Sequence, residues 1–278
     1  MSLLVPVHLP ADVLPGGLAE FSGHLDAAPP APAGDYVLRA ETGAEPRACV
    51  SPLLKGLNIL RESRTGGVPR LWLGSAWTRE FYLHLHRLIR GLPAPRCIVL
   101  SPPRIADCPT LVEFLALYRP LEAELARRRP GIRLLLENRC VETPDEPQFL
   151  VARIQDLVGL ARAVDSQGLT LALALNLPQL FRAHFGEKPP TARQVEEVLT
   201  SLRSCAPAVA ALRPLADPDG LFGSPELTRA ALVRLREILS DGRRRHLLPA
   251  DHPEPAAGMA ALQQTGFTAA SEAQTPTP

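Results

Sequence analysis

The alternation of apolar runs with amphipathic stretches is the feature that most constrains this fold. Seven short apolar runs span the 210 residues from Tyr36 to His246 in six steps, a mean spacing of 35 residues. Near-continuous apolar runs are typical of parallel strands that are buried on both faces of a sheet. The runs lie at residues 36–38, 71–73, 97–100, 132–136, 169–175, 209–212 and 246–248, with a weaker first strand at 5–7.

The stretches between these runs have helical periodicity and recognisable helix starts. Ser224 followed by Pro225, for example, supplies a capping hydroxyl and a proline suited to the first helical position. The predicted helices cover residues 78–92, 110–129, 148–164, 191–205 and 224–239, with a short one at 254–264 after the last strand.

The spacing predicts the architecture. Eight units of this spacing need about 280 residues, and the chain has 278, which favours a (β/α)8 TIM barrel. The alternative is an open doubly wound sheet, which normally carries a glycine-rich phosphate turn after its first strand; the sequence has none. We expect one barrel domain over residues 1–265, with an irregular first unit, and a flexible polar tail over 266–278.

Composition excludes several classes of protein. Thirty basic and 29 acidic side chains leave a net charge of +1, so nucleic acid is an unlikely partner. No apolar run approaches the length of a membrane helix, so no membrane association is predicted. The five cysteines are scattered without a C-x-x-C pair, and the first residues do not resemble a signal peptide, which together indicate a cytoplasmic protein with reduced thiols.

Glu137 is the most informative candidate site residue. In a barrel of this type, residues that follow the C-terminal ends of the strands line the active-site mouth, and Glu137 directly follows the run Leu134–Leu136. A carboxylate there is costly to bury without a cation or hydrogen-bond donors. Two interpretations stay open: a metal ligand or general base, and a structural ion pair with Arg139 or a neighbouring arginine.

Arginines also follow several predicted strands. A ring of guanidinium groups at the mouth would repel a metal cation and favour a carboxylate or phosphate. Arginines at strand ends are equally common as simple salt-bridge partners, so this interpretation also stays open. The candidates are Arg39, Arg104, Arg139 and Arg213.

Two segments carry a family resemblance. Residues 134–139 (LLLENR) and 173–179 (LALNLPQ) resemble the xylose isomerase-like barrels, which include sugar isomerases, epimerases and type IV apurinic endonucleases. Residues 221–224 and 245–249 also resemble segments of these barrels, so the likeness runs from about residue 97 to 252. The resemblance implies a divalent metal held by glutamates after strands five and eight and an aspartate after strand six, with histidines.

The expected ligands are largely missing from this chain. Glu137 matches the strand-five carboxylate, but Asn176 stands where the strand-six aspartate is expected, and Gln179 where a histidine often follows. Ala250 replaces the strand-eight glutamate, with Asp251 one residue late. Since hard divalent ions need anionic oxygen ligands, the sequence predicts weak or no divalent metal binding.

A shifted metal site is the remaining route to metal chemistry. Asp251 and His252, with Asp217 from the preceding loop, could join Glu137 as ligands. If Glu137 faces another carboxylate such as Asp251, we expect Glu137→Gln to raise stability; if its partner is an arginine, the same change lowers it.

The sequence leaves two functions open. In the first, the barrel acts on or binds a sugar, phosphosugar or related polar molecule, with Glu137 as ligand or base. The residues that would orient this substrate are Asn138, Arg139, Asn176, Gln179 and Arg104. In the second, the barrel is catalytically inactive and binds a ligand or a protein partner, including a second copy of itself. An abasic-site nuclease is a third candidate, but it requires several metals and a basic groove.

Overall fold

The computed structural model of this chain describes a large part of the C-terminal half and the strands of the N-terminal part. The described residues are 3–8, 18–23, 36–40, 64–65, 68–69, 72, 82, 94–141, 148–186, 188–214, 224–248, 262 and 264–269.

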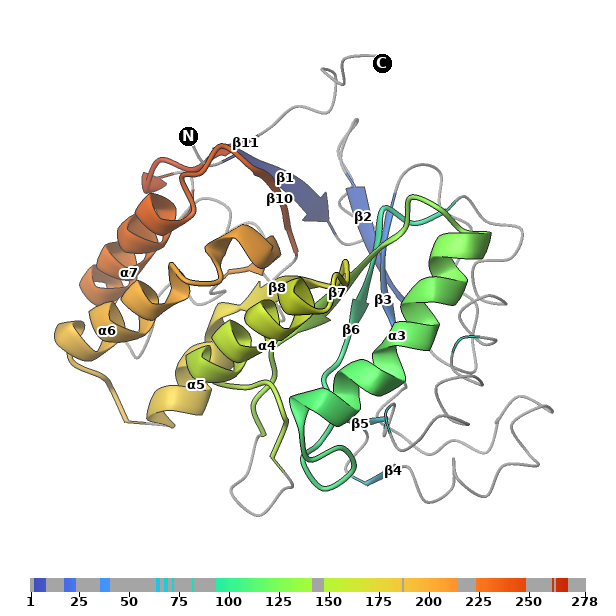
Figure 1. Cartoon of the computed structure of the whole chain (residues 1–278). Helices are drawn as coiled ribbons and strands as arrows, with labels where there is room; N and C mark the ends of the chain where they lie inside the picture. The colour runs from blue at the N-terminus through green and yellow to red at the C-terminus, as the bar shows by residue number, and fades with distance from the viewer. Residues whose placement is uncertain are drawn as a thin grey trace.

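Eight parallel strands within the described residues form a closed barrel (Figure 1). Each strand pairs with its neighbour in chain order, and the last strand of the ring pairs with the first through Leu3–Arg244 to Pro6–Leu247. The sequence-based prediction of a (β/α)8 barrel is therefore confirmed. The eight strands are β1 (Leu3–His8), β2 (Leu18–Gly23), β3 (Tyr36–Ala40), β6 (Cys97–Leu100), β7 (Arg133–Glu137), β8 (Ala172–Asn176), β9 (Val209–Arg213) and β10 (Arg244–Leu247).

The assignment of the early strands from sequence was wrong in two places. The run at 71–73 is not a barrel strand, because β3 pairs directly with β6 and Trp72 lies in a turn. The second strand is instead Leu18–Gly23, whose alternating apolar and polar residues lack the continuous apolar character of the later strands. A two-stranded antiparallel pair, β4 (Arg64–Thr65) and β5 (Val68–Pro69), lies outside the barrel sheet.

A ninth short strand fills part of the seam between β1 and β2. β2 pairs with β1 only at Val7 and His8, whereas β11 (Thr268–Ala269) pairs with Leu3 and Leu4. Since β10 already occupies one edge of Leu3 and Leu4, β11 lies on the edge that β1 shares with β2. Thr268 and Ala269, which lie in the segment expected as a tail, thus pair with β1.

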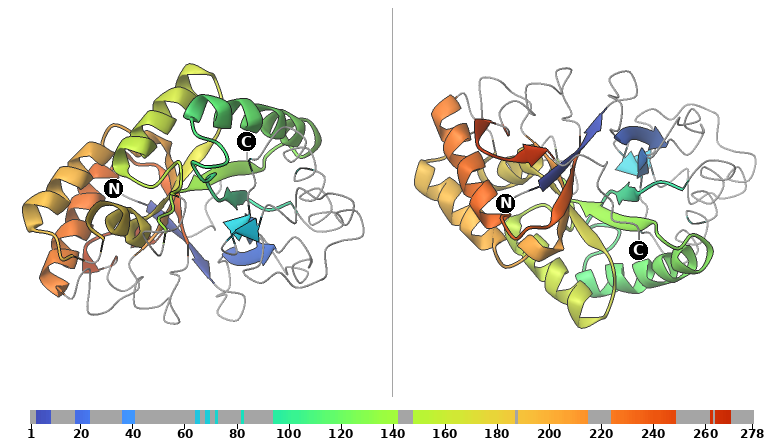
Figure 2. Two further views of the ribbon diagram at one scale, coloured as in Figure 1. Left: turned by 90° about the horizontal axis from the view of Figure 1, so that it is seen from below. Right: turned by 90° about the horizontal axis from the view of Figure 1, so that it is seen from above.

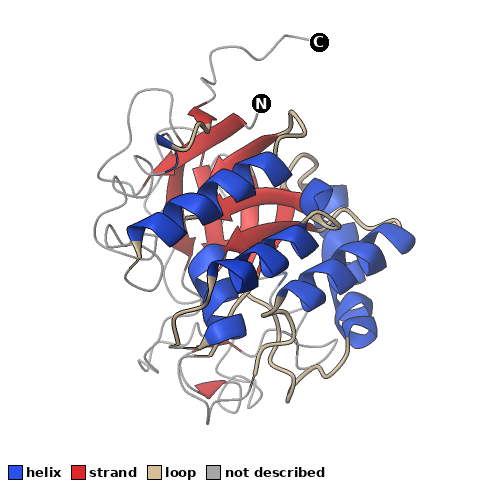
Figure 3. Ribbon diagram, turned by 90° about the vertical axis from the view of Figure 1, so that its left-hand side faces the viewer, coloured by secondary structure: helices blue, strands red, loops and turns tan. Residues whose placement is uncertain are grey.

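Helices cover the outside of the strands (Figures 2 and 3). Several begin at capping side chains that accept a backbone N–H of the first turn: Thr110 accepts from Glu113 at 3.2 Å, and Ser224 accepts from Leu227 at 3.2 Å. No helix among the described residues is both long and apolar enough to cross a membrane. The helices are α3 (Leu111–Arg128), α4 (Ile154–Ser166), α5 (Leu177–Phe185), α6 (Ala192–Leu202) and α7 (Pro225–Ile238), with a 3₁₀ turn, η2 (Ala206–Ala208).

Side chains of each strand alternate between the barrel interior and the helix layer. On β7, Leu135 belongs to the small interior cluster, while Leu134 and Leu136 belong to the larger cluster that includes the helices. Ala174 and Ala211 continue the interior cluster on β8 and β9. The same alternation directs Glu137, Asn176 and Arg213, each two residues further on, into the interior at the C-terminal mouth.

Candidate functional site

A buried ion pair occupies the barrel interior at the mouth. Glu137 is 1% exposed and Arg213 is 2% exposed, and the Arg213 Nε lies 2.6 Å from the Glu137 Oε1. A second guanidinium, that of the 20%-exposed Arg139, lies 3.6 Å from Glu137 Oε2. The two residues of the buried pair come from strand ends, Glu137 from β7 and Arg213 from β9, so the pair spans the intervening strand β8.

Asn176, at the end of β8, connects this pair to the following helix. Its side-chain Nδ2 donates to Glu137 Oε1 at 3.3 Å, and its Oδ1 accepts the backbone N–H of Gln179 at 3.2 Å. The second contact caps the N-terminus of α5, which is why Asn is well suited to this position. Asn176 therefore takes part both in the polar cluster of the mouth and in starting a helix.

Asn138 and Gln179 hold neighbouring strand ends together. The Asn138 side chain donates to the backbone oxygen of Asn176 at 3.0 Å and accepts the backbone N–H of Asn176 at 2.8 Å. Gln179 Oε1 accepts the backbone N–H of Cys140 at 2.8 Å. These amides thus satisfy backbone groups where the ladder between β7 and β8 has ended.

Arg104 lies on the loop that leaves β6 at the same end of the barrel. Its side chain is 4% exposed, and its guanidinium lies 4.8 Å from the centre of the Phe149 ring. The two residues also form an isolated antiparallel bridge, which fixes the β6 loop to the chain segment that precedes α4. This cation–π contact places a second buried guanidinium on the rim.

The structure brings together five of the predicted site residues: Glu137, Asn138, Arg139, Asn176 and Gln179. Arg104 lies on the same rim. The predicted ligands Asp217, Asp251 and His252 lie outside the described residues and stay predictions.

Arg139, which the sequence named as a partner of Glu137, makes the longer contact, whereas the closer partner, Arg213, was only one of the candidate arginines. Strand register is the signal that could have found it, since Asn176 pairs directly with Arg213 across β8 and β9.

His184 has a structural contact. Its Nε2 accepts the backbone N–H of Ile154 at 3.0 Å, which satisfies a free donor at the start of α4. Burial and then the nearby Arg153 guanidinium lower the pKa of this imidazole. The neutral ring, which the hydrogen bond requires, is therefore favoured.

Cys140 does not have the environment of an activated nucleophile. Burial raises the pKa of its thiol, and this effect outweighs the opposing effects of Arg182 and Arg153. The reactive thiolate form is therefore disfavoured at neutral pH.

The described residues do not fit a divalent metal ion. No group of three or more histidine, cysteine, aspartate or glutamate side chains comes together among them. The carboxylate of Glu137 already receives the Arg213 guanidinium at 2.6 Å, with the charge of Arg139 nearby. A metal ion at Glu137 would have to displace a buried cation and remain close to two positive charges.

Comparison with known proteins gives matches among solved structures. No protein-family model matches the chain, and no curated protein sequence matches it. A xylose isomerase domain protein from Planctomyces limnophilus is 11% identical over 95% of each chain, with a TM-score of 0.46. An L-ribulose 3-epimerase is 14% identical over 88% of this chain and 85% of that chain, with a TM-score of 0.45.

A D-psicose 3-epimerase from Clostridium cellulolyticum H10 is 11% identical over 82% of this chain and 68% of that chain, with a TM-score of 0.40. These proteins are xylose isomerase-like barrels, the group that residues 97–252 resemble. At such identities and scores, the likeness carries no information about the residues of the mouth. The assignment of the (β/α)8 fold rests on the strand pairing itself.

Proposed function

We propose that this chain is a barrel that binds a small polar or anionic molecule at its C-terminal mouth without a divalent metal. One observation carries the proposal: the Arg213 guanidinium pairs with Glu137, the carboxylate that the resemblance to metal-binding barrels assigns as a ligand. A fixed side-chain cation thus stands at a position where those barrels use a metal.

The charge of the rim supports an anionic ligand. The guanidinium groups of Arg139 and Arg213 both face the one carboxylate of Glu137. A third guanidinium, that of Arg104, lies on the β6 loop, which also carries the carboxylate of Asp107. Arginine forks match carboxylate and phosphate oxygens, so a sugar acid or phosphosugar fits this rim better than a neutral sugar. Arg139 is the most accessible of the residues that contact Glu137, and we assign it the first contact with the ligand.

Binding is favoured over metal-assisted catalysis because the polar groups of the mouth are engaged with one another. Glu137 would act as a base only after its contact with Arg213 is weakened, and Asn138 uses its amide on the backbone of β8. Isomerase or epimerase chemistry at a metal rebuilt from Asp217, Asp251 and His252 is the competing function. It requires tightly held metal.

The test combines metal analysis with ligand binding. We expect the purified chain to lack stoichiometric zinc, manganese or magnesium. In thermal-shift and calorimetric measurements, sugar acids or sugar phosphates should bind more tightly than neutral sugars, and a chelator should leave this binding unchanged. Stoichiometric metal, or binding that a chelator abolishes, would contradict the proposal.

A matched pair of variants locates the site. Arg139→Gln removes a guanidinium next to Glu137 and should weaken binding of the sugar acid or sugar phosphate about tenfold or more. Arg193→Gln removes a guanidinium from α6 whose side chain is 89% exposed and pairs only weakly with Glu197. Equal weakening by the two variants would mean that the ligand binds elsewhere.

A further inference from the structure

A cavity lies at the end of the barrel opposite the mouth, where β7, β8, β9 and β10 begin. Its volume is about 750 Å³, and it is bounded by the C-terminal end of α4 and by η2. Arg133, which lines it, is the first residue of β7, whereas Glu137 is the last. At a rise of about 3.3 Å per residue the two ends are about 13 Å apart along the strand, so the cavity is separate from the mouth.

The polar lining of this cavity is mainly basic. Three guanidinium groups accompany one carboxylate, and two hydroxyl groups complete the polar part. These residues are Arg133, Arg162, Arg243, Asp165, Thr170 and Ser204. Among the lining residues the positive charges outnumber the negative charge by two, and Asp241, outside the lining, offsets part of the charge of Arg243. An excess of positive charge favours a phosphate or carboxylate.

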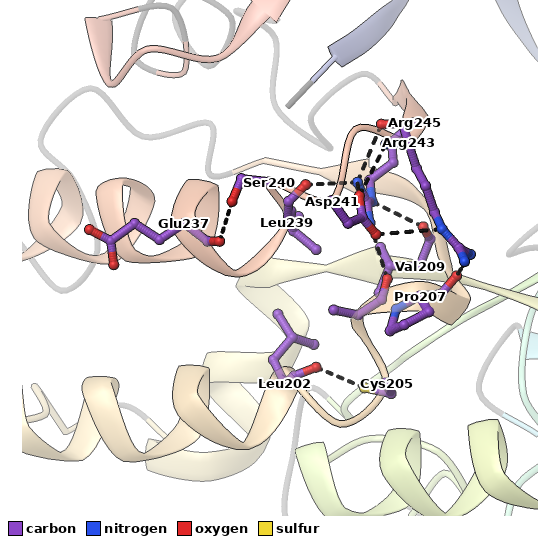
Figure 4. Close-up of polar contacts among 11 residues, drawn as sticks. Leu202, Cys205, Pro207, Val209, Glu237, Leu239, Ser240, Asp241, Arg243 and Arg245 are labelled. Atoms are coloured by element: carbon purple, nitrogen blue, oxygen red, sulfur yellow. Dashed lines mark hydrogen bonds and ion pairs between the residues drawn. The ribbon is translucent and has the colours of Figure 1, made fainter. Parts of the chain in front are cut away.

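One of the three arginines is held in place by the protein. Arg243 Nη1 donates to the backbone oxygen of Pro207 at 2.6 Å, and its Nε lies 3.6 Å from Asp241 Oδ2 (Figure 4). These contacts position the guanidinium against the wall that η2 forms. A positioned donor loses less conformational entropy when it binds an anion.

The other two arginines, Arg133 and Arg162, make no side-chain contact of this kind among the described residues. Within the part of the chain that the structure describes, the side chains of Arg133 and Arg162 make no hydrogen bond or ion pair, and the Asp165 carboxylate does not pair with Arg162. The positive field extends into the barrel: after burial, the charges of Arg133 and Arg96 are the causes that lower the pKa of His246 to about 4.

The remaining walls of the cavity are apolar. They include Ile132 and Leu171 at the starts of two strands, Leu169 before β8, and Pro207 and Ala208 of η2. An inorganic ion would leave this surface in contact with water. An anion that carries an apolar group would cover it and gain from its burial.

We propose that this cavity is a second binding site, and that it takes a small organic anion in which a phosphate or carboxylate is joined to an apolar group. Arg133 and Arg162 bind the anionic group together with the positioned Arg243. The apolar walls between β7, β8 and η2 contact the rest of the molecule. Asp165 opposes binding through its charge.

Phenyl phosphate is a suitable probe, with inorganic phosphate as its control, in calorimetric titrations of the whole chain at low salt. We expect phenyl phosphate to bind about tenfold more tightly than inorganic phosphate. Arg162→Gln should weaken binding of phenyl phosphate about tenfold, because it removes one charge-assisted contact. Arg193→Gln makes the same change of charge outside the cavity and should have less than a twofold effect.

Asp165→Asn is a variant that should strengthen binding, in contrast to Arg162→Gln. Removing the one carboxylate should tighten binding of phenyl phosphate several-fold, a result that damage to the fold would not produce. The proposal is wrong if phenyl phosphate does not bind at millimolar concentration, if Asp165→Asn weakens binding, or if Arg162→Gln and Arg193→Gln weaken it equally. A short oligonucleotide that binds more tightly than phenyl phosphate, with equal sensitivity to both arginine variants, would indicate a diffuse basic surface and also overturn the proposal.

Discussion

The two ends of this barrel each contain a buried arginine paired with a carboxylate, and the pairs differ in what surrounds them. At the mouth, Arg213 and Glu137 are both almost fully buried, and side-chain groups of Asn176 and Arg139 lie around them. At the opposite end, Arg245 is 1% exposed, but its partner Asp241 retains 29% exposure.

Backbone oxygens accept further hydrogen bonds from Arg245, so the Arg245–Asp241 pair has a structural role. Arg245 donates to Asp241 through two contacts of 2.8 Å and also to the carbonyl oxygens of Ala206, Val209 and Leu239 (Figure 4). It thereby fixes η2 and the end of α7 to β10. The comparison separates two uses of a buried guanidinium: that of Arg245 is bound by backbone carbonyls and fixes parts of the fold to one another, whereas that of Arg213 is bound by a side chain of the mouth.

The largest effect should come from breaking the mouth pair on one side. Arg213→Met leaves the Glu137 carboxylate buried without its closest cation, at a cost of about 3–5 kcal/mol of unfolding free energy. For the same reason Glu137→Gln should lower stability, since the guanidinium of Arg213 contacts its carboxylate. Urea denaturation of both variants measures these losses.

The double variant Glu137→Gln with Arg213→Met is the control for this experiment. It removes both charges, so it should be more stable than Arg213→Met alone. Losses that simply add in the double variant would show that the two side chains do not depend on one another.

A smaller effect should appear on acidification, through His246. Burial, followed by the charges of Arg133 and Arg96, lowers the pKa of this imidazole from an ordinary 6.5 to about 4. Between these values the unfolded chain binds a proton that the folded chain does not, so stability falls as pH falls from 6.5 towards 4. The loss is about 3 kcal/mol at most, and none of it is present above pH 6.5.

His246→Gln should remove most of this pH dependence, measured as the midpoint of urea unfolding between pH 7 and 4. His184, whose pKa is also lowered, provides the matched variant His184→Gln and should leave the larger part of the dependence in place. An unchanged pH profile in His246→Gln would mean that other groups cause it.

Breaking the Arg245–Asp241 pair should cost less unfolding free energy than breaking the Glu137–Arg213 pair. Asp241→Asn leaves the carbonyl contacts of Arg245 intact, and Asp241 is partly solvated, so we expect a loss of about 1 kcal/mol. Arg245 Nη1 also donates to the carbonyl of Arg243 at 3.4 Å. If Asp241→Asn costs as much as Arg213→Met, the distinction drawn between the two ends fails.

The smallest expected effect is that of a chelator. A bound metal stabilises the folded state by mass action, so its removal lowers the melting temperature. Because Glu137 already has a side-chain cation, dialysis against a chelator should leave the melting temperature unchanged. A fall that added zinc or manganese reverses would return Asp217, Asp251 and His252 to consideration as ligands.

The later strands could be predicted from sequence because their burial on both faces produces continuous apolar runs. The clearest cases are β7 and β8, which end at Glu137 and Asn176. Two early strands, β1 and β3, were also predicted, but β2 was not: Leu18–Gly23 contains Glu20 and Ser22, and the buried Trp72, expected in a strand, belongs to a turn. Apolar content alone does not distinguish a strand from a core residue of a loop.

The candidate site was predictable in its positions and not in its partners. Strand ends place Glu137 and Asn176 at the mouth, and this follows from the period of a strand alone. Which guanidinium meets Glu137 depends on a strand two positions away in the sheet, so the pairing with Arg213 requires the three-dimensional register. The use of Asn138 to satisfy the backbone of Asn176 likewise depends on where the ladder ends.

The seam at β1 has a consequence for biosynthesis. β1 pairs with Arg244–Leu247 on one edge and with Thr268–Ala269 on part of the other, so it finds these partners only after the other strands of the ring have been synthesised. The ring therefore cannot close while the earlier units are being translated. Until it closes, β1 exposes the backbone N–H and C=O groups that these partners later bind. Nascent chains halted before residue 244 should depend on chaperones to a degree that the released chain does not.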